Sequence, residues 1–289
     1  MPRIEKSSEL GFCFGVKQAI ETLEKSRLKS GSGKVEMLGA LVHNPLVVQR
    51  LTGKGISVIQ SVAEAEGDVV AISAHGVGPQ VLEEIDARKL KMIDTTCPLV
   101  RRPQRAAREL AEAGFYVVVF GEKDHPEVKG ILGWAGGKGI AILDAEQLKK
   151  EVGRVPRKLG VVAQTTQIPA LFTEFVQKLS ALVLSEVAEL RVVNTICRVT
   201  RKRQSEALRL ARKTDLMIVV GGRTSANTRR LADLCSAYGV ETHLVETAAE
   251  LEAKWLRGKE CVGLVSGTST PAEVTDDVLK RLNEMAGLS

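Results

Sequence analysis

Three of the five cysteines in this chain open similar stretches of sequence and have the chemistry of metal ligands. They are Cys13 in GFCFGVKQAI, Cys97 in DTTCPLVRRP and Cys197 in NTICRVTRKR. A polar motif follows each cysteine after 28 to 30 residues, and a second polar motif follows further on. Spacing that repeats in this way predicts equivalent structural units. The first motifs are His43-Asn44-Pro45, His125-Pro126-Glu127 and Ser225-Ala226-Asn227, and the second are Ser73-Ala74-His75-Gly76, Gln164-Thr165-Thr166 and Ser266-Gly267-Thr268-Ser269.

Three thiolates that converge on one point would hold an iron–sulfur cluster or a metal ion. Four irons normally take four ligands, so three cysteines would leave one iron open. An open coordination position lets a metal act as a Lewis acid on a substrate. Two alternatives stay open from the spacing alone, namely three separate buried thiols and a zinc ion with three thiolates. Cys235 and Cys261 lie inside a helix-like and a strand-like run, where we expect them to be buried and inert.

The polar motifs hold three of the four histidines of the chain and predict a site for a small polyanion. His43, His75 and His125 stand at comparable places in the repeat. Ser225, Asn227 and Ser269 would add further hydrogen-bond donors. Such a lining suits a diphosphate, and loops that lead into helix N-termini would add backbone N–H groups. The fourth histidine, His243, lies in a strand-like stretch and is expected to be structural.

Glu127 and Thr165 are the candidates for proton transfer. Glu127 is the only carboxylate inside the motifs, and burial beside a polyanion would favour its protonated form. It could then act as a general acid, with the Thr165 hydroxyl as a relay. The alternative is a carboxylate that stabilises a helix N-terminus. A loop threonine is also most often a turn or cap residue.

The elements that would position these residues alternate between apolar strands and helices. This pattern predicts an α/β fold with small parallel sheets, covered by helices on both faces. The repeat predicts three similar domains, at 13-96, 97-196 and 197-289, arranged with pseudo-threefold symmetry around a central cluster. Segment 1-12 would complete the third sheet, through Arg3–Leu10. We expect strands at Val35–Leu38, Val69–Ile72, Tyr116–Phe120, Ile140–Leu143, Leu159–Val162, Leu190–Val193, Leu216–Val220 and Cys261–Val265, and helices at Val16–Leu28, Pro79–Lys89, Gln104–Glu112, Ala170–Leu184, Gln204–Arg212 and Arg229–Tyr238.

Composition excludes several other functions. The net charge is +6, but aromatic residues make up only 3%, which argues against nucleic-acid binding. The basic residues Arg198, Arg201, Lys202 and Arg203 are expected on a solvated helix face. Neither a run of about 18 apolar residues nor a signal peptide is present, so we expect a cytoplasmic protein without membrane contact. The segment 30–34 (SGSGK) lacks the spacing of a phosphate-binding loop, and Ser30-Gly31-Ser32-Gly33 is expected to be a turn.

Together these motifs resemble a known enzyme family. GFCFGVKQAI, LVHNPLVV, SAHGV, DTTCPLV, HPEVKG, AQTTQ, NTICRVTRKRQ, SANT and SGTSTP occur in this order over nearly the whole chain. The chain is similar to the 4-hydroxy-3-methylbut-2-enyl diphosphate reductases of the methylerythritol phosphate route to isoprenoids. One departure is Ala226, where some family members carry a serine, and it could remove one hydrogen bond to the diphosphate.

The resemblance implies roles for the motif residues. Cys13, Cys97 and Cys197 would hold one [4Fe-4S] cluster with an open iron. Glu127 would supply protons, with Thr165 orienting the substrate hydroxyl. The reaction would be a two-electron reductive dehydroxylation that gives isopentenyl and dimethylallyl diphosphates, with electrons from a donor protein such as ferredoxin or flavodoxin. The diphosphate would be held by His43, His75, His125, Ser225, Asn227 and Ser269.

Two other functions remain as alternatives. One is a quinolinate synthase-like dehydratase, in which the cluster acts as a Lewis acid without net redox chemistry. A dicarboxylate substrate would call for more arginine in the loops. The other is a non-catalytic iron or redox sensor. We expect a monomer, because the motifs of one chain complete the site.

Overall fold

The computed structural model describes residues 2–29 and 34–287, and in this part of the chain all strands belong to three four-stranded parallel sheets. The predicted turn at Ser30-Gly31-Ser32-Gly33 lies outside the described residues. Tertiary contacts divide the chain into two compact units. Unit 1 combines the chain up to Lys17, Val42–Arg50 and the chain from Arg198 onward, and unit 2 combines Gln18–Leu41 with Leu51–Cys197.

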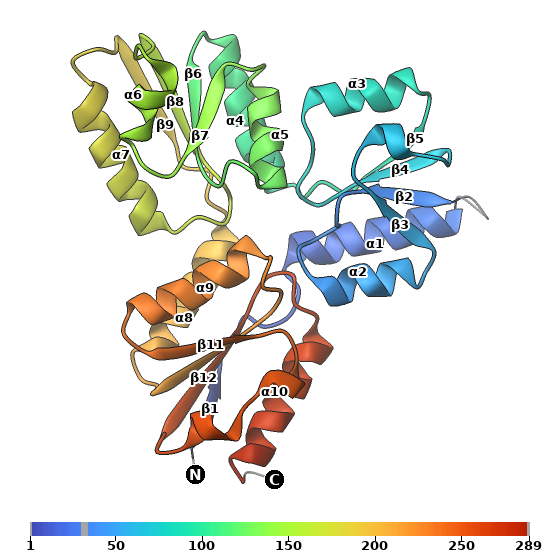
Figure 1. Ribbon diagram of the computed structural model, residues 1–289, viewed down its shortest axis with the longest axis vertical. Helices are drawn as coiled ribbons and strands as arrows, with labels where there is room; N and C mark the ends of the chain where they lie inside the picture. The colour runs from blue at the N-terminus through green and yellow to red at the C-terminus, as the bar shows by residue number, and fades with distance from the viewer. Residues whose placement is uncertain (1, 30–33, 288–289) are drawn as a thin grey trace. The chain divides into compact units, whose positions relative to one another are not determined.

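Unit 1 contains one sheet with helices on both faces (Figure 1). Its order is β1-β12-β10-β11, and all neighbours are parallel. Alternate side chains of the two central strands pack against α8 and α9 on one face and against α10 on the other. The strands are β1 (Arg3–Lys6), β10 (Leu216–Val220), β11 (Glu241–Val245) and β12 (Cys261–Ser266), and the helices are α8 (Arg198–Ala211), α9 (Ala226–Ala237) and α10 (Ala272–Met285).

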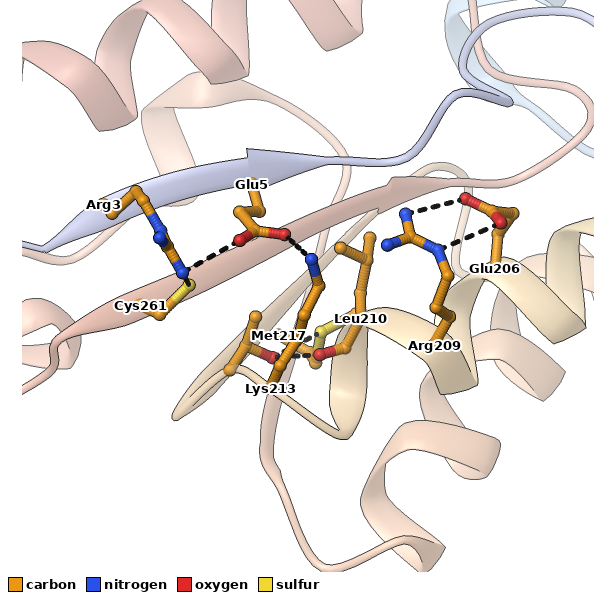
Figure 2. A network of polar contacts seen from close by, with 9 residues as sticks. Arg3, Glu5, Glu206, Arg209, Leu210, Lys213, Met217 and Cys261 are labelled. Carbon is orange, nitrogen blue, oxygen red and sulfur yellow. Dashed lines mark hydrogen bonds and ion pairs between the residues drawn. The ribbon is translucent and has the colours of Figure 1, made fainter.

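The N-terminal strand β1 adds an edge to this sheet, as the sequence predicted for this segment. It pairs with β12 in the register Arg3 to Cys261 and Lys6 to Leu264. Figure 2 shows the polar contacts that fasten it, in which Glu5 bonds to both Arg3 and Lys213. The hydrogen bond from the Lys213 ammonium holds the pKa of Glu5 below its ordinary value.

The first sheet of unit 2 has the order β3-β2-β4-β5. One face of it packs against α3 and a short 3-10 helix, Val62–Glu64, through Val70, Ile72 and Ile85. Pro79 begins α3 at a position where its missing N–H costs nothing. The elements of this region of the chain are α1 (Phe14–Lys29), β2 (Val35–Leu38), α2 (Pro45–Thr52), β3 (Ile56–Ile59), β4 (Val69–Ile72), α3 (Pro79–Ala87) and β5 (Lys91–Asp94).

The second sheet of unit 2 repeats this order as β7-β6-β8-β9. On one face α4 and α5 cover Val117, Val119 and Val162, and on the other α6 and α7 cover Val118 and Val161. Its elements are α4 (Arg101–Glu112), β6 (Tyr116–Phe120), α5 (Pro126–Trp134), β7 (Gly139–Ile142), α6 (Gln147–Val152), β8 (Lys158–Ala163), α7 (Pro169–Val183) and β9 (Glu189–Val193).

The predicted α/β class with small parallel sheets is confirmed. The division into domains at 13-96, 97-196 and 197-289 and their symmetric arrangement stay predictions. Two further 3-10 helices, Ala248–Glu250 and Ala253–Leu256, complete the elements of the described residues. No helix in that part of the chain is both long and apolar enough to span a membrane.

Candidate functional site

The motifs occupy equivalent places in the three sheets, because each sheet has the same strand order. The first motif follows β2, β6 or β10, and the second follows the neighbouring central strand β4, β8 or β12. A cysteine follows the edge strand β5, β9 or β1. The carboxyl ends of parallel strands are where open α/β sheets bind ligands. His43 and Asn44, which follow β2, belong to unit 1.

Each candidate cysteine is fixed by a backbone hydrogen bond to a second motif. The N–H of Cys13 donates to Thr268 O at 3.0 Å, that of Cys97 to Ala74 O at 3.1 Å, and that of Cys197 to Thr165 O at 2.9 Å. All three side chains are partly exposed. A helix starts directly after Cys13 and Cys197 and four residues after Cys97. Helix N-termini favour negative charge, so each thiolate would be electrostatically supported there.

The loops that carry Cys97 and Cys197 share one local structure. Asp94 accepts a hydrogen bond from Thr96 N at 2.9 Å, and Asn194 accepts one from Ile196 N at 3.1 Å. A buried threonine precedes each cysteine by two residues, and Thr195 accepts from Ala163 N at 2.8 Å. Burial opposes ionisation of Asp94, but the bonds from Thr96 and Arg101 outweigh it, so the pKa of Asp94 lies below its ordinary value. The repeated geometry explains why DTTC and NTIC recur in the sequence.

His75 and His125 meet in unit 2. Their rings are in edge-to-face contact, with centroids 5.4 Å apart. His125 caps α5, because its Nδ1 accepts a hydrogen bond from Glu127 N at 3.1 Å. That bond places the ring proton of neutral His125 on Nε2, which can therefore donate to a ligand. His75 Nδ1 lies 3.5 Å from the Ser73 hydroxyl.

Glu127 and Thr165 form a buried pair in the same unit. Glu127 is only 2% exposed and lies in the first turn of α5. Its carboxylate accepts from Thr165 N at 2.6 Å and from the Thr165 hydroxyl at 2.8 Å. Both of these bonds tie the carboxylate to the loop after β8. A chain of contacts therefore runs through unit 2. Cys97 bonds to the residue before His75, His75 contacts His125, and His125 bonds to Glu127. Glu127 bonds in turn to Thr165, which bonds to Cys197.

Unit 1 holds buried polar groups at the ends of β10 and β12. Asn227 is 2% exposed, and neither polar atom of its amide has a hydrogen-bond partner among the described residues. The Ser269 hydroxyl is likewise buried and unpartnered there. A buried polar group without a partner costs free energy, and native proteins rarely keep one without a use. Ser225 differs, because its hydroxyl caps α9 by accepting from Thr228 N at 3.4 Å.

His43 also lies in unit 1 and packs against the loop after β10. A Cβ atom at Gly222 would come within 2.6 Å of His43 O, so only glycine allows this approach. The next residue, Asn44, accepts from Leu46 N at 3.0 Å and so helps begin α2. Unit 1 therefore contains Cys13, His43, Ser225, Asn227 and Ser269.

The sequence reasoning misjudged Arg203, which was expected on a solvated face. It is 3% exposed, because it lies on the buried side of α8 together with Thr200, Ala207 and Leu210. Its guanidinium donates to Ser266 O and Gly267 O at 2.8 Å each and to Gly11 O at 2.6 Å. Burial lowers the pKa of Arg203. Thr200, Arg203, Ala207 and Leu210 are spaced three or four residues apart, which puts them on one face of a helix, so this spacing could have shown that Arg203 is buried.

The cysteines and the histidine that were predicted to lie outside the site are found in structural positions. Cys235 and Cys261 are buried. His243 lies in β11, where its ring stacks on Trp255 at 3.9 Å and bonds to Glu241 at 2.9 Å. These contacts give His243 a structural role.

Comparison with known proteins assigns this α/β chain to a family. The model of the LytB protein family matches residues 4–283. A 4-hydroxy-3-methylbut-2-enyl diphosphate reductase of Dehalococcoides mccartyi strain CBDB1 is 48% identical over 284 residues, which cover 98% of this chain and 99% of the relative. The enzyme of that name from Aquifex aeolicus is 41% identical over 278 residues, covering 95% and 94%.

Two solved structures support the same relation. One, titled as (E)-4-hydroxy-3-methyl-but-2-enyl diphosphate reductase, the terminal enzyme of the non-mevalonate pathway, is 40% identical with a TM-score of 0.69, covering 98% of this chain and 100% of that one. The other is the E-1-hydroxy-2-methyl-but-2-enyl-4-diphosphate reductase from Plasmodium falciparum, which is 28% identical with a TM-score of 0.90, covering 98% and 88%.

Fold and site define an α/β enzyme with thiols and hydrogen-bonding groups at the ends of parallel strands. The matches over nearly the whole chain narrow this class of α/β enzymes to one family. The chain belongs to the LytB family, and its relatives in these comparisons are 4-hydroxy-3-methylbut-2-enyl diphosphate reductases. The family resemblance expected from the motifs is confirmed.

Proposed function

We propose that this chain reduces 4-hydroxy-3-methylbut-2-enyl diphosphate to isopentenyl and dimethylallyl diphosphates. The C–O bond of the allylic hydroxyl breaks, two electrons and two protons are consumed, and one water is released. A full-length match to reductases at 48% identity supports this substrate. The buried Glu127–Thr165 pair is the structural observation that carries the proposal, because this reaction needs a proton donor sheltered from solvent.

The diphosphate is assigned to the polar motifs. In unit 1, the buried Asn227 Nδ2 and Ser269 hydroxyl lack partners among the described residues, and both can donate to the oxygens of a polyanion. The N-terminus of α9, next to Ser225, would add backbone N–H groups. In unit 2, His75 and His125 are assigned the same role, and the capping bond at Nδ1 leaves Nε2 of His125 as the donor.

Glu127 and Thr165 are assigned to proton delivery. A carboxylate that accepts two hydrogen bonds is held in one orientation, and the Thr165 hydroxyl can pass a proton along that bond. Thr165 also accepts the backbone bond from Cys197, so the proton path ends beside a cysteine loop. This contact supports a role for Thr165 in orienting the substrate hydroxyl.

The three cysteines fit an iron–sulfur cluster. Thiols of this kind are the usual cluster ligands, and Cys13, Cys97 and Cys197 are partly exposed and held by equivalent backbone bonds. We assign them one [4Fe-4S] cluster, with one iron open. When bound, the cluster would supply the electrons and Lewis acidity. Electrons would come from a carrier such as ferredoxin or flavodoxin, and we propose a cytoplasmic monomer.

Anaerobic turnover tests the proposal. Protein reconstituted with iron and sulfide is given the hydroxy-diphosphate and reduced methyl viologen, and the products are separated and counted. We expect both isoprenoid diphosphates, with two viologens oxidised per product. A dehydratase of the quinolinate synthase type would oxidise none, and a sensor would not turn over. Either result overturns the proposed function.

A further inference from the structure

A cavity lined with arginine lies on unit 2 outside the motifs. Its volume is about 260 Å³. It is formed by α4 and by Trp134 at the end of α5, two helices that pack side by side (Figure 1). The sequence RRPQRAARELAE gives α4 four arginines against two glutamates. The lining residues are Arg101, Gln104, Arg105, Arg108, Glu109 and Trp134.

The positive charge of this cavity is only partly compensated. Arg101 pairs with Asp94 at 2.7 Å, and Arg108 pairs with Glu112 at 3.2 Å. Arg105 has no carboxylate within ion-pair distance in the described part of the chain, and Glu109 is the one acidic residue in the lining. The Arg108 guanidinium lies 5.9 Å from the centre of the Trp134 ring, which holds it over an apolar surface. A net positive, concave surface attracts acidic partners.

Gln104 gives the cavity a buried polar wall. It is 6% exposed, and its Nε2 has no hydrogen-bond partner among the described residues. A Cβ atom at Gly76 would lie 2.5 Å from this Nε2, so the amide reaches the loop that carries His75. The wall of the cavity therefore contacts the candidate site. The amide faces Gly76 in that loop and Gly130 in α5, so Gln104 joins the cavity wall to the His75 loop, and the arginines are the groups that face an incoming partner.

The cavity also adjoins a candidate cluster ligand. The first turn after Cys97 folds back on it, with Val100 N donating to Cys97 O at 2.9 Å and Arg101 N donating to the same atom at 3.2 Å. Arg101 thus belongs both to the cavity lining and to the Cys97 turn. A carrier protein seated here would stand next to the cysteine loop.

We propose that the α4 cavity is the docking surface for an acidic one-electron carrier protein, whose carboxylates pair with Arg105 and Arg108. This inference rests on the proposed function. Two reduced carriers dock in turn, each gives up one electron and leaves oxidised, and the protons come from elsewhere. Nucleic acid fits less well, because Trp134 is the only aromatic residue in the lining and its indole N–H is taken by Val77 O at 2.9 Å.

The test compares two electron sources in the holoenzyme. One is a purified acidic ferredoxin, chemically reduced, and the other is reduced methyl viologen. Arg105→Glu should lower the kcat/KM for ferredoxin about tenfold at low ionic strength, since long-range charge controls such association. Viologen-driven turnover should stay within about twofold, because a small reductant needs no docking surface. Arg108→Gln should lower the ferredoxin value less.

Arg257→Glu is the matched control, because Arg257 is exposed and lies in unit 1. It changes net charge equally and should leave ferredoxin kinetics near those of the parent. The proposal is overturned if Arg105→Glu and Arg257→Glu have the same kcat/KM for ferredoxin, or if the viologen-driven rate of Arg105→Glu falls together with its ferredoxin-driven rate. It is also overturned if a single-stranded oligonucleotide binds the parent but not Arg105→Glu, and ferredoxin does not compete with the oligonucleotide. Failure of the parent with viologen would instead contradict the proposed function.

Discussion

The thiols of this chain fall into two groups according to their surroundings. Cys13, Cys97 and Cys197 are partly exposed at the starts of helices. Cys235 packs in the apolar layer between α8, α9 and the sheet of unit 1, and burial raises the pKa of its thiol to about 12. Since the thiolate is the reactive form and the metal ligand, Cys235 is unsuited to either role near neutral pH.

The first prediction separates these groups by substitution. Cys13→Ser, Cys97→Ser or Cys197→Ser should each remove the visible absorption of the reconstituted protein together with turnover. Cys235→Ala and Cys261→Ala are the controls and should keep both. Iron content, absorption and viologen-driven turnover are measured on the same samples. A Cys97→Ser enzyme with a full cluster and full activity would refute the ligand assignment.

The second prediction concerns the buried carboxyl. Glu127→Gln keeps the shape and can still accept from Thr165 N, but it cannot deliver a proton. We expect the cluster to form and the single-turnover rate with excess viologen to fall about 10²–10⁴-fold, the usual range for a general acid. Thr165→Val should lose less, since water can replace a relay. A Glu127→Gln rate within about threefold of the parent, well below that range, would leave Glu127 as a helix-start carboxylate.

The third prediction concerns the buried polar groups of unit 1. Ser269→Ala should weaken diphosphate binding by about 1.5–3 kcal/mol, the cost of losing one hydrogen bond to a charged group. Asn227→Ala should have a similar effect, because it removes the Nδ2 donor. Ser236→Ala, at an exposed site on α9, is the control. Affinity is measured by calorimetry on oxidised holoenzyme, and parental affinity in both site variants would rule out this anion site.

At the scale of elements, burial decided which strands the sequence could predict. β2, β4, β6 and β10 occur where continuous apolar runs placed them. Among the edge strands, β7 and β9 were predicted and β11 was expected only as a strand-like stretch around His243, whereas β3 and β5 were not predicted. β5 (KMID) begins and ends with a charged residue, which hides the apolar signal. The helices α2 and α5 were expected after the first motifs but without bounds, although each begins at a proline in a first motif, the usual first helical position.

The candidate site was predictable for a different reason. Its residues recur in the same order in each stretch, with the first motif 28 to 30 residues after the cysteine, so repetition suggested them without knowledge of contacts. Arg203 has no counterpart in the repeat, and its role depends on three carbonyl groups distant in sequence. The repeat suggested Thr165 as a proton relay for Glu127, but the additional bond from Thr165 N to the same carboxylate depends on loop geometry that the sequence does not show.

The fourth prediction tests Arg203 as the residue that positions two loops. Arg203→Met keeps the apolar stem but leaves the carbonyls of Gly11, Ser266 and Gly267 without this donor. Each buried unsatisfied group costs about 1–3 kcal/mol, so the free energy of unfolding should fall by several kcal/mol. Arg201→Met, on the exposed face of α8, should change it little. The free energy of unfolding of both variants is measured in urea. If Arg203→Met is as stable as Arg201→Met, Arg203 does not hold the two loops.

At the scale of the whole molecule, unit 1 is assembled from three separate segments of the chain. Its sheet takes an edge strand from the N-terminus and the other strands from beyond Leu216. The predicted boundaries at Cys97 and Cys197 follow the repeat in sequence, whereas the compact units follow contacts such as that between His43 and Gly222. Folding of unit 1 must therefore bring together distant parts of the chain, which costs loop-closure entropy.

The fifth prediction concerns this long-range closure. Deletion of residues 2–6 removes β1, and β12 then loses its backbone pairing with β1 and the cover of Ile4, while its pairing with β10 remains. We expect faster amide hydrogen exchange in β12 and β10 while β6 and β8 keep their protection, since unit 2 has its own cores. Iron binding should also fall, because β1 leads directly to Cys13. Glu5→Gln removes the ion pairs with Arg3 and Lys213 but leaves the backbone pairing of β1 intact (Figure 2), so it is the control and should change exchange little. If β12 stays protected after the deletion, the edge strand is dispensable and Cys13 is held by its own loop through Thr268.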